Sequence, residues 1–164
     1  MRIDVIMLNN SNFDRYGNNV AKLYSEFRGK VAINPNLIRS MINGYYKIWF
    51  ATDGRGVPMG ILVLGVRDLP ISSTIDLVYV DSKKRHRGIG DAMLRRAISY
   101  SNIKKVSYID LYRDSKDKFL EELYKKYGFC NEPHSKTSTR MIKSFHRHKL
   151  FKEVNIWVLQ ILVE

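Results

Sequence analysis

The 164-residue chain has one cysteine and four prolines, and it lacks a long run of apolar residues. A single cysteine excludes an intrachain disulfide and favours a reducing compartment, so we interpret Cys130 as a packing residue and expect a cytoplasmic protein. No stretch approaches the roughly 20 apolar residues that cross a bilayer, and MRIDVIMLNN at the start lacks the apolar core of a signal peptide. We therefore expect no membrane association.

Acidic residues are also scarce. Sixteen Asp and Glu stand against 28 Lys and Arg, which gives a net charge of +12. Residues 1–82 hold 9 basic and 7 acidic residues, whereas residues 83–164 hold 19 and 9. The excess in the second half suits a polyanionic ligand or a nucleic acid, and it equally suits a merely soluble basic surface.

Hydrophobic residues make up 45% of the chain, and no repeat or linker interrupts it, which predicts a single domain over residues 1–164. We divide it into a core, 1–143, and a C-terminal extension, 144–164. Apolar periodicity predicts helices at 12–28, 35–44, 88–100 and 116–127, and strands at 2–8, 46–51, 60–66, 73–80, 105–111, near 129, at 139–142 and at 154–163. Such a mixture indicates an α/β or α+β fold with a mixed sheet.

The segment RHRGIG, residues 85–90, separates an apolar strand ending at Val80 from a helical pattern beginning at Asp91. Gly88 and Gly90 permit backbone conformations closed to other residues, so successive N–H groups can point at one anion. The helix start adds the equivalent of roughly half a positive charge. The Walker and GxGxxG patterns are both incomplete, but a diphosphate fits the segment.

Two motifs in order carry a family resemblance. RHRGIG has the form (Arg or Gln)-x-x-Gly-x-(Gly or Ala), and ELYKKYGF follows at 122–129. Together they resemble the acetyl-CoA loop and the Leu-Tyr-x-x-x-Gly-Phe segment of the GNAT superfamily of N-acetyltransferases, and TRMIK at 139–143 is similar to the family's late strand. The resemblance covers about residues 45–143. It implies a mixed, mostly antiparallel central sheet flanked by about four helices, to which 154–163 would add an extra C-terminal strand.

The resemblance also implies a binding site for acetyl-CoA as co-substrate. The strand before the glycine loop would pair with the pantetheine arm through its backbone, and the loop would hold the pyrophosphate. The implied binding residues are Val78, Tyr79, Val80, Arg85, His86, Arg87, Gly88, Ile89, Gly90 and Asp117. Asp117 stands where the family often has asparagine, so a cation such as Lys116 or Lys118 would have to lie between its carboxylate and the cofactor.

Two residues receive catalytic roles from the same resemblance. Tyr124 matches the family's tyrosine and would protonate the departing CoA thiolate. Its alternative is a core aromatic side chain on an apolar helix face. Asp76 holds the family's acidic position on the strand before the loop and would take the proton of the amine, directly or through water. Its alternative is a carboxylate paired with a nearby cation.

We therefore expect an acetyl-CoA-dependent N-acetyltransferase that moves the acetyl group directly to a primary amine. A small amine, a protein N-terminus or lysine, and an aminoacyl-tRNA, as in toxin-like enzymes, are all open as acceptors. A non-catalytic acyl-CoA-binding module is the alternative from another class. The apolar stretch 154–163 would be a poor exposed edge, so it would pair within the fold or across a homodimer. His146 and His148 lack an accompanying Cys or carboxylate cluster, so we expect no metal.

Overall fold

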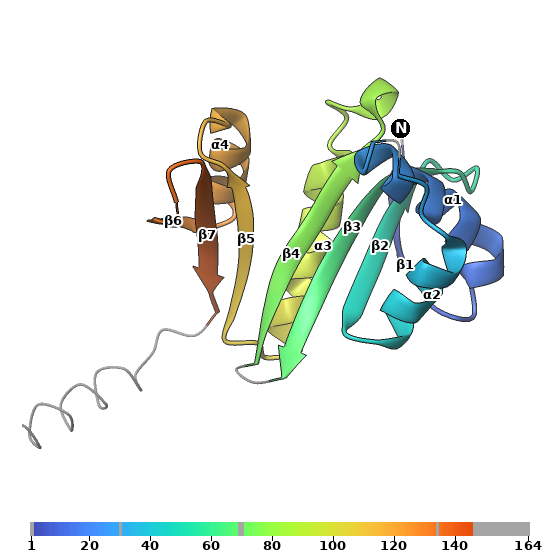
Figure 1. Cartoon of the computed structure of the whole chain (residues 1–164), viewed down its shortest axis with the longest axis horizontal. Coiled ribbons are helices and arrows are strands. Elements are labelled where there is room, and N and C mark those ends of the chain that lie inside the picture. Colours follow the sequence, from blue (N-terminus) through green and yellow to red (C-terminus); the bar gives the residue numbers. More distant parts are fainter. Residues whose placement is uncertain (1, 30, 69–70, 134, 146–164) are drawn as a thin grey trace, which may run out of the picture.

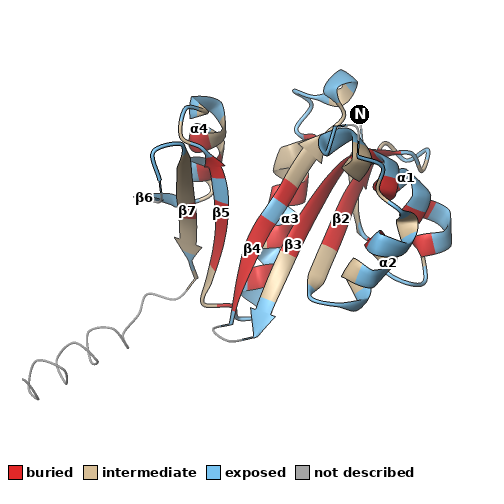
Figure 2. Ribbon diagram, viewed as in Figure 1, coloured by how far each residue is buried: buried red, intermediate tan, exposed pale blue. Residues whose placement is uncertain are grey.

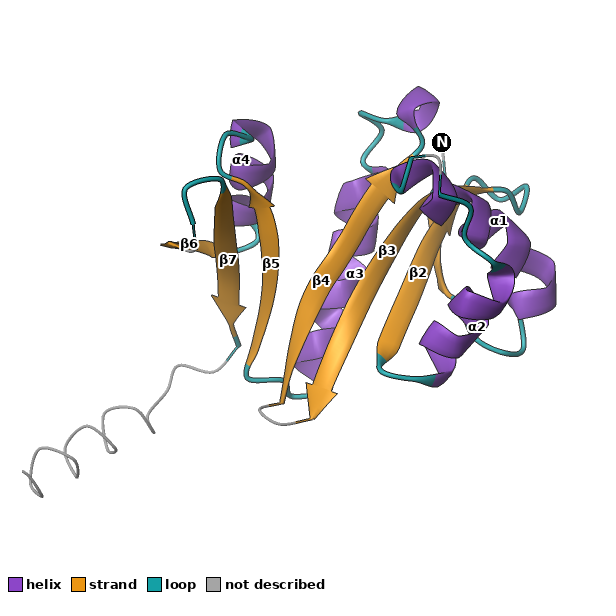
Figure 3. Ribbon diagram, in the orientation of Figure 1, coloured by secondary structure: helices purple, strands orange, loops and turns teal. Residues whose placement is uncertain are grey.

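The computed structural model describes residues 2–29, 31–68, 71–133 and 135–145. Within them the chain forms, in order, β1 (Asp4–Met7), α1 (Phe13–Phe27), α2 (Pro35–Asn43), β2 (Tyr46–Thr52), β3 (Pro58–Asp68), β4 (Ile71–Val80), a 3₁₀ turn (Ser82–Lys84), α3 (Ile89–Ile103), β5 (Tyr108–Asp114), α4 (Lys118–Lys126), β6 (Cys130–Pro133) and β7 (Ser138–Ser144). The described strands make one sheet in the order β1-β2-β3-β4-β5-β7-β6 (Figures 1 and 3). In this sheet β4 and β5 run parallel and the other described pairs run antiparallel, which confirms the predicted fold class.

Helices cover both faces of the sheet, because successive strand residues point to opposite faces. Trp49 and Leu62 belong to the apolar cluster that includes α3, whereas Phe50 and Ile61 belong to the cluster that includes α1 and α2. The buried residues concentrate in β2, β3, β4 and β5 (Figure 2). Each fully buried Ile or Leu contributes about 1.5–3 kcal/mol. Burial on both sides explains why β3 reads as a continuous apolar run.

A glycine sets how closely α3 packs on the sheet. A Cβ atom at Gly60 of β3 would lie 2.9 Å from Met93 Cε and 3.0 Å from the Tyr79 carbonyl oxygen. A side chain at Gly60 would therefore require the Met93 side chain to move and the Tyr79 carbonyl group to shift by a few tenths of an ångström, so glycine favours this close approach. The start of α3 is thereby held against the end of β4, where the candidate site lies.

The sheet opens between β4 and β5. These strands pair only over Ser72–Ile75 and Tyr108–Leu111. The register between β4 and β3 then skips Asp76, which is therefore a β-bulge. Beyond it β4 pairs with β3, while β5 pairs with β7, and the two strands diverge (Figure 1). The backbone of Val78–Val80 is consequently left without a strand on its β5 side.

The observed boundaries correct one predicted element. The strand expected at 105–111 begins only at Tyr108. Lys105 has a φ of +55°, and the amide of Val106 donates to the Ser101 carbonyl oxygen at 3.1 Å. These two residues therefore close the end of α3 and cannot start a strand.

The prediction that Cys130 is a packing residue is wrong. Cys130 is exposed at the start of β6, which is an edge strand of the sheet. The strand predicted at 154–163 lies outside the described residues, as do His146 and His148. In the described part of the chain, no helix combines the length and the apolar character needed to cross a bilayer.

Candidate active site

A cleft of about 840 Å³ opens where β4 and β5 diverge. Its walls are the end of β4, the glycine loop, the start of α3 and one face of α4, and the end of α1 reaches its rim. Ten of the predicted site residues line it: Val78, Tyr79, Val80, Arg85, His86, Gly88, Ile89, Gly90, Asp117 and Tyr124. The cleft lining does not include Arg87 or Asp76.

Eight further residues line the cleft, and sequence reasoning did not identify them as site residues: Glu26, Phe27, Lys84, Asp91, Leu94, Phe119, Leu120 and Leu123. The α4 members had a signal, since Leu120 and Leu123 share helical spacing with Tyr124, but that spacing equally fits a core. Phe119 belongs to the same helix and is 70% exposed. Phe27 reaches the cleft only through the tertiary packing of α1, where its ring lies 6.1 Å from that of Tyr79.

The glycine loop forms an open cradle at the start of α3. Gly88 is the N-cap residue, with a φ of +75°, and no side chain caps the helix. The first amides of α3 therefore have no side-chain acceptor, which makes them available to an anion. A Cβ at Gly90 would stand 3.8 Å from Val80 Cγ2, an ordinary contact. Gly88 is thus needed for its backbone conformation, whereas Gly90 leaves room.

Cations surround this cradle. Lys84, Arg85 and His86 line the cleft. Arg85 donates from Nε to the Val80 carbonyl oxygen at 3.1 Å, and its guanidinium lies 5.9 Å from the centre of the Tyr79 ring. These contacts hold its charge at the end of β4, beside the cradle.

Asp91 is the acidic residue in the first turn of α3, and its charge is compensated. Its carboxylate accepts hydrogen bonds from the Tyr127 hydroxyl and from Lys126 Nζ, and it pairs with Arg95 at 3.0 Å. Burial raises the pKa of Asp91, but the bonds from Tyr127 and Lys126 outweigh burial and lower it overall. The same contacts join the end of α4 to the start of α3 across the cleft.

Tyr124 is buried, with 7% of its surface exposed, and its ring meets Phe129 edge-on at 5.8 Å. In the described part of the chain its hydroxyl makes no hydrogen bond. Burial, together with the nearby Asp117 carboxylate, raises the pKa of Tyr124 to about 12. The phenol therefore stays protonated throughout the neutral range, as a proton donor must.

Asp76 lies on the face of the sheet that α1 covers, whereas Tyr124 belongs to the apolar cluster on the α3 face. Its Oδ2 atom lies 3.0 Å from where a Cβ at Gly65 would be. Gly65 alternates along β3 with Ile61 and Val63, which face α1, so the carboxylate is on the α1 side. Asp76 is exposed as a residue, but partial burial of this carboxylate raises its pKa. Arg67 opposes the rise and Asp110 adds to it.

Asp110 is a second carboxylate at the strand opening, which sequence reasoning did not single out. It is buried, accepts a hydrogen bond from Thr74 at 2.6 Å, and accepts two from Arg140 at 2.6 and 2.8 Å. Its oxygens are therefore committed to structural partners. Of the two carboxylates, Asp76 is the one left to exchange a proton.

These residues fit acetyl-CoA. A cradle of uncapped amides with adjacent cations suits the pyrophosphate. The backbone of Val78–Val80, which pairs with β3 but has no strand on its β5 side, suits the amide groups of the pantetheine arm. No group of three or more His, Cys, Asp or Glu side chains gathers as a metal site within residues 2–145 as far as these are described.

Comparison with known proteins identifies the family. The profile described as acetyltransferase (GNAT) domain matches residues 44–131, more than half of the chain. No curated protein matches the sequence. A chain of the NatC complex bound to Gag peptide and CoA aligns with a TM-score of 0.72 at 18% identity, covering 89% of this chain and 100% of that one.

Two further solved structures agree. The PaiA N-acetyltransferase from Thermoplasma acidophilum in complex with coenzyme A has a TM-score of 0.67 at 15% identity, with 88% and 100% of the two chains covered. The ribosomal-protein-S18-alanine N-acetyltransferase from Escherichia coli has a TM-score of 0.68 at 16% identity, with 91% and 97% covered. At such identities these structures show the fold alone, while the profile match shows the family. The chain belongs to the GNAT family of acetyltransferases.

Proposed function

We propose that this protein is an acetyl-CoA-dependent N-acetyltransferase that transfers the acetyl group directly to a primary amine. The observation that carries the proposal is one continuous cleft, which joins the anion cradle at Gly88 to the buried phenol of Tyr124 along the unpaired edge of β4. Such a cleft holds a long molecule with an anionic end and a reactive end.

Each part of the cleft has its own role in holding acetyl-CoA. The amides at the start of α3, with Arg85 and His86, would bind the pyrophosphate. The backbone of Val78–Val80 would bind the pantetheine arm, and an N–H near Val78 would polarise the thioester carbonyl. Asp117 caps α4, since its Oδ1 accepts from the Leu120 amide at 2.9 Å, so its contact with the cofactor needs an intervening cation. Arg87 does not line the cleft, and its contact with the pyrophosphate is a proposal.

The two catalytic residues lie on opposite faces of the opening, which suits direct transfer. The neutral amine would approach from the α1 side, and its nitrogen would form the new bond to the acetyl carbon. Asp76 would accept the proton that the nitrogen loses. The carbon–sulfur bond breaks toward the α4 side, where Tyr124 would donate its proton to the departing sulfur.

Two neighbours in the comparison support a protein N-terminus as the acceptor class. One was solved with a Gag peptide, and the other is named for an alanine of ribosomal protein S18. A small amine and an aminoacyl-tRNA are the alternative acceptors to be tested. The tRNA is included because residues 83–164 carry most of the positive charge of the chain. We also propose that the protein is cytoplasmic.

The test is transfer of radiolabelled acetyl from acetyl-CoA to a panel of peptides, small amines and aminoacyl-tRNA. We expect labelled product with one acceptor class. In Tyr124→Phe, kcat should fall about 10²-fold, as is typical for loss of a general acid. The dissociation constant for acetyl-CoA should stay within about twofold, because the ring that lines the cleft is kept.

Transfer at the wild-type rate by Tyr124→Phe would show that the phenol is not the acid. Acetyl-CoA binding without transfer to any acceptor in the panel would instead support the acyl-CoA-binding module.

A further inference from the structure

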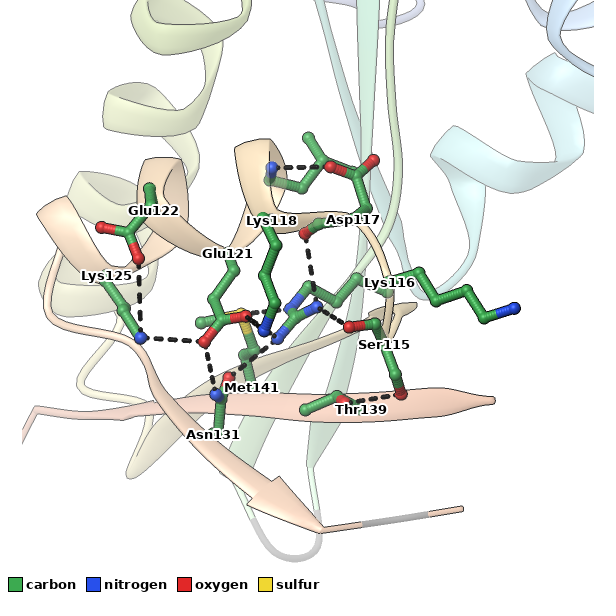
Figure 4. A network of polar contacts seen from close by, with 12 residues as sticks. Ser115, Lys116, Asp117, Lys118, Glu121, Glu122, Lys125, Asn131, Thr139 and Met141 are labelled. Atoms are coloured by element: carbon green, nitrogen blue, oxygen red, sulfur yellow. Dashed lines mark hydrogen bonds and ion pairs between the residues drawn. The ribbon is translucent and has the colours of Figure 1, made fainter. Parts of the chain in front are cut away.

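A polar cluster connects α4 and the loop before it with residues of β6 and β7 (Figure 4). Its centre is Arg113 of β5, whose side chain is 2% exposed. Arg113 Nη1 donates to the backbone carbonyl oxygens of Asp114, Ser115 and Asp117, at 2.8, 3.3 and 3.3 Å. The loop between β5 and α4 is therefore wrapped around one guanidinium group.

The other side of the guanidinium reaches α4 and β6. Arg113 Nη2 lies 2.8 Å from Glu121 Oε2 in the first turn of α4, and 3.3 Å from Asn131 Oδ1. Lys118 and Lys125 contact the same carboxylate from the solvent side, at 3.0 and 2.8 Å. Hydrogen bonds from Lys125, Asn131 and Lys118 hold the pKa of Glu121 well below its ordinary value.

Lys118 and Lys125 add to the compensation of the Glu121 charge from the solvent side. What Arg113 alone supplies is the set of bonds to three loop carbonyl groups. Its planar fork can serve several acceptors at once, which a lysine ammonium at this position would not reproduce. Arg113 therefore fixes the conformation of the loop between β5 and α4.

That loop leads directly into the wall of the cleft. Asp117 ends the loop, caps α4 through Leu120, and lines the cleft, as does Tyr124. Arg113 itself does not line the cleft. A change at Arg113 can therefore reach the site through the placement of Asp117 and α4.

We propose that Arg113 is a positioning residue for Tyr124: by fixing the loop 114–117 and the first turn of α4, it sets where the Tyr124 hydroxyl lies in the cleft. This inference rests on the proposed function, in which that hydroxyl donates the proton to sulfur. The arrangement ties strand, loop and helix together through one buried side chain.

The test is a double-mutant cycle on kcat with Arg113→Met, Tyr124→Phe and the double variant, each as the full chain. Arg113→Met should lower kcat at least tenfold, since displacement of a catalytic group by about 1 Å costs up to about 10²-fold. The double variant should be no slower than Tyr124→Phe alone, because the position of an absent hydroxyl cannot matter. Lys125→Met is the matched control: it removes a partner of Glu121 but leaves every bond of Arg113, so kcat should stay near the wild-type value.

Multiplied losses in the double variant would overturn the inference, because Arg113 would then act independently of Tyr124. Wild-type kcat in Arg113→Met would overturn it as well. Where Arg113→Met does not fold, Arg113→Lys replaces it in the same cycle, since it keeps the charge but loses the fork.

A second measurement needs neither acceptor nor activity, and so separates this inference from the proposed function. Carbon-13 NMR of the labelled Tyr124 ring follows ionisation of the phenol with pH. In Arg113→Met the pKa of the Tyr124 phenol should fall below about 12. Burial of the ring and the nearby Asp117 carboxylate raise this pKa, and both depend on the position of the loop. An unchanged pKa would show that Arg113 does not place Tyr124. If Tyr124→Phe is inactive but Arg113→Met keeps full turnover, only the inference about Arg113 is refuted. If Tyr124→Phe is active, the proposed role of Tyr124 as the acid is refuted.

Discussion

Individual residues at the opening of the sheet show how neighbouring carboxylates take different roles. Asp110 and Asp76 come from adjacent strands, and the charge of Asp110 contributes to the raised pKa of Asp76. Asp110 is held by Thr74 and Arg140, whereas Asp76 sits on a bulge with its carboxylate over Gly65. Bulges re-aim side chains next to active sites, and in the proposed reaction this one would let Asp76 face the incoming amine.

Arg67 gives a way to test Asp76. Arg67 opposes the burial that raises the pKa of Asp76, so Arg67→Gln should raise that pKa further. A base must be unprotonated to act, and kcat/KM therefore falls as pH drops through its pKa. The acidic limb of the pH profile should move to higher pH in Arg67→Gln, and more so at low salt, because Arg67 is exposed.

The same amine substrate must be used for the wild type and every variant, so that its own ionisation affects all the pH profiles equally. Arg55→Gln is the control, because Arg55 is 88% exposed in the β2–β3 turn and should leave the limb in place. An acidic limb that is identical in wild type, Arg67→Gln and Asp76→Asn would exclude Asp76 as the base.

Among the elements, α4 depends on charged contacts at both ends. Arg113 and Glu121 hold its first turn to β5, and Asp91 of α3 accepts bonds from Lys126 and Tyr127 near its end. Between these ends Tyr124 and Leu120 face the apolar interior. The helix that forms one wall of the cleft is therefore sensitive to the ionisation of these partners.

Acid should loosen this element through Glu121. Its folded-state pKa is lowered from the ordinary 4.5, so the ionised carboxylate stabilises the fold above about pH 4.5, and this contribution is lost as pH falls toward the folded-state value. Glu121→Gln should therefore melt at a lower temperature than the wild type at pH 7, and the difference should shrink below about pH 4.5. Thermal unfolding followed by circular dichroism measures both.

Glu122→Gln is the neighbouring control, since the Glu122 side chain is 75% exposed and its change should alter the melting temperature little at any pH. A difference between Glu121→Gln and wild type that persists unchanged at pH 3 would contradict the ionic account of α4.

At the scale of the whole molecule, the sequence predicted the order and type of the described elements because the information for these is local. Gly88 could be predicted at a helix start because it lies between an apolar strand and a helical pattern, and Gly128 at a helix end because glycine adopts the positive φ that closes a helix; both have a positive φ. Tyr124 could be found because it lies within a spaced motif on one helix.

Features that depend on tertiary pairing could not be predicted. The bulge at Asp76 arises from the register between two strands, and Phe27 reaches the cleft only when α1 docks. Arg113 and Glu121 read as ordinary surface charges on a strand and a helix. Their burial follows only when β6 and β7 close over the loop between β5 and α4.

The most direct test of this account is calorimetric titration of acetyl-CoA into the wild-type protein, Gly88→Val and Gly54→Val. Gly54 has a φ of +88° with open space around it in the β2–β3 turn, and Gly88 has a φ of +75° with open space at the cradle, so the two changes impose similar backbone strain. We predict saturable binding to wild type and to Gly54→Val, and a loss of at least tenfold in affinity for Gly88→Val. Binding that is equal in all three, or absent in wild type, would contradict a cofactor cradle at the start of α3.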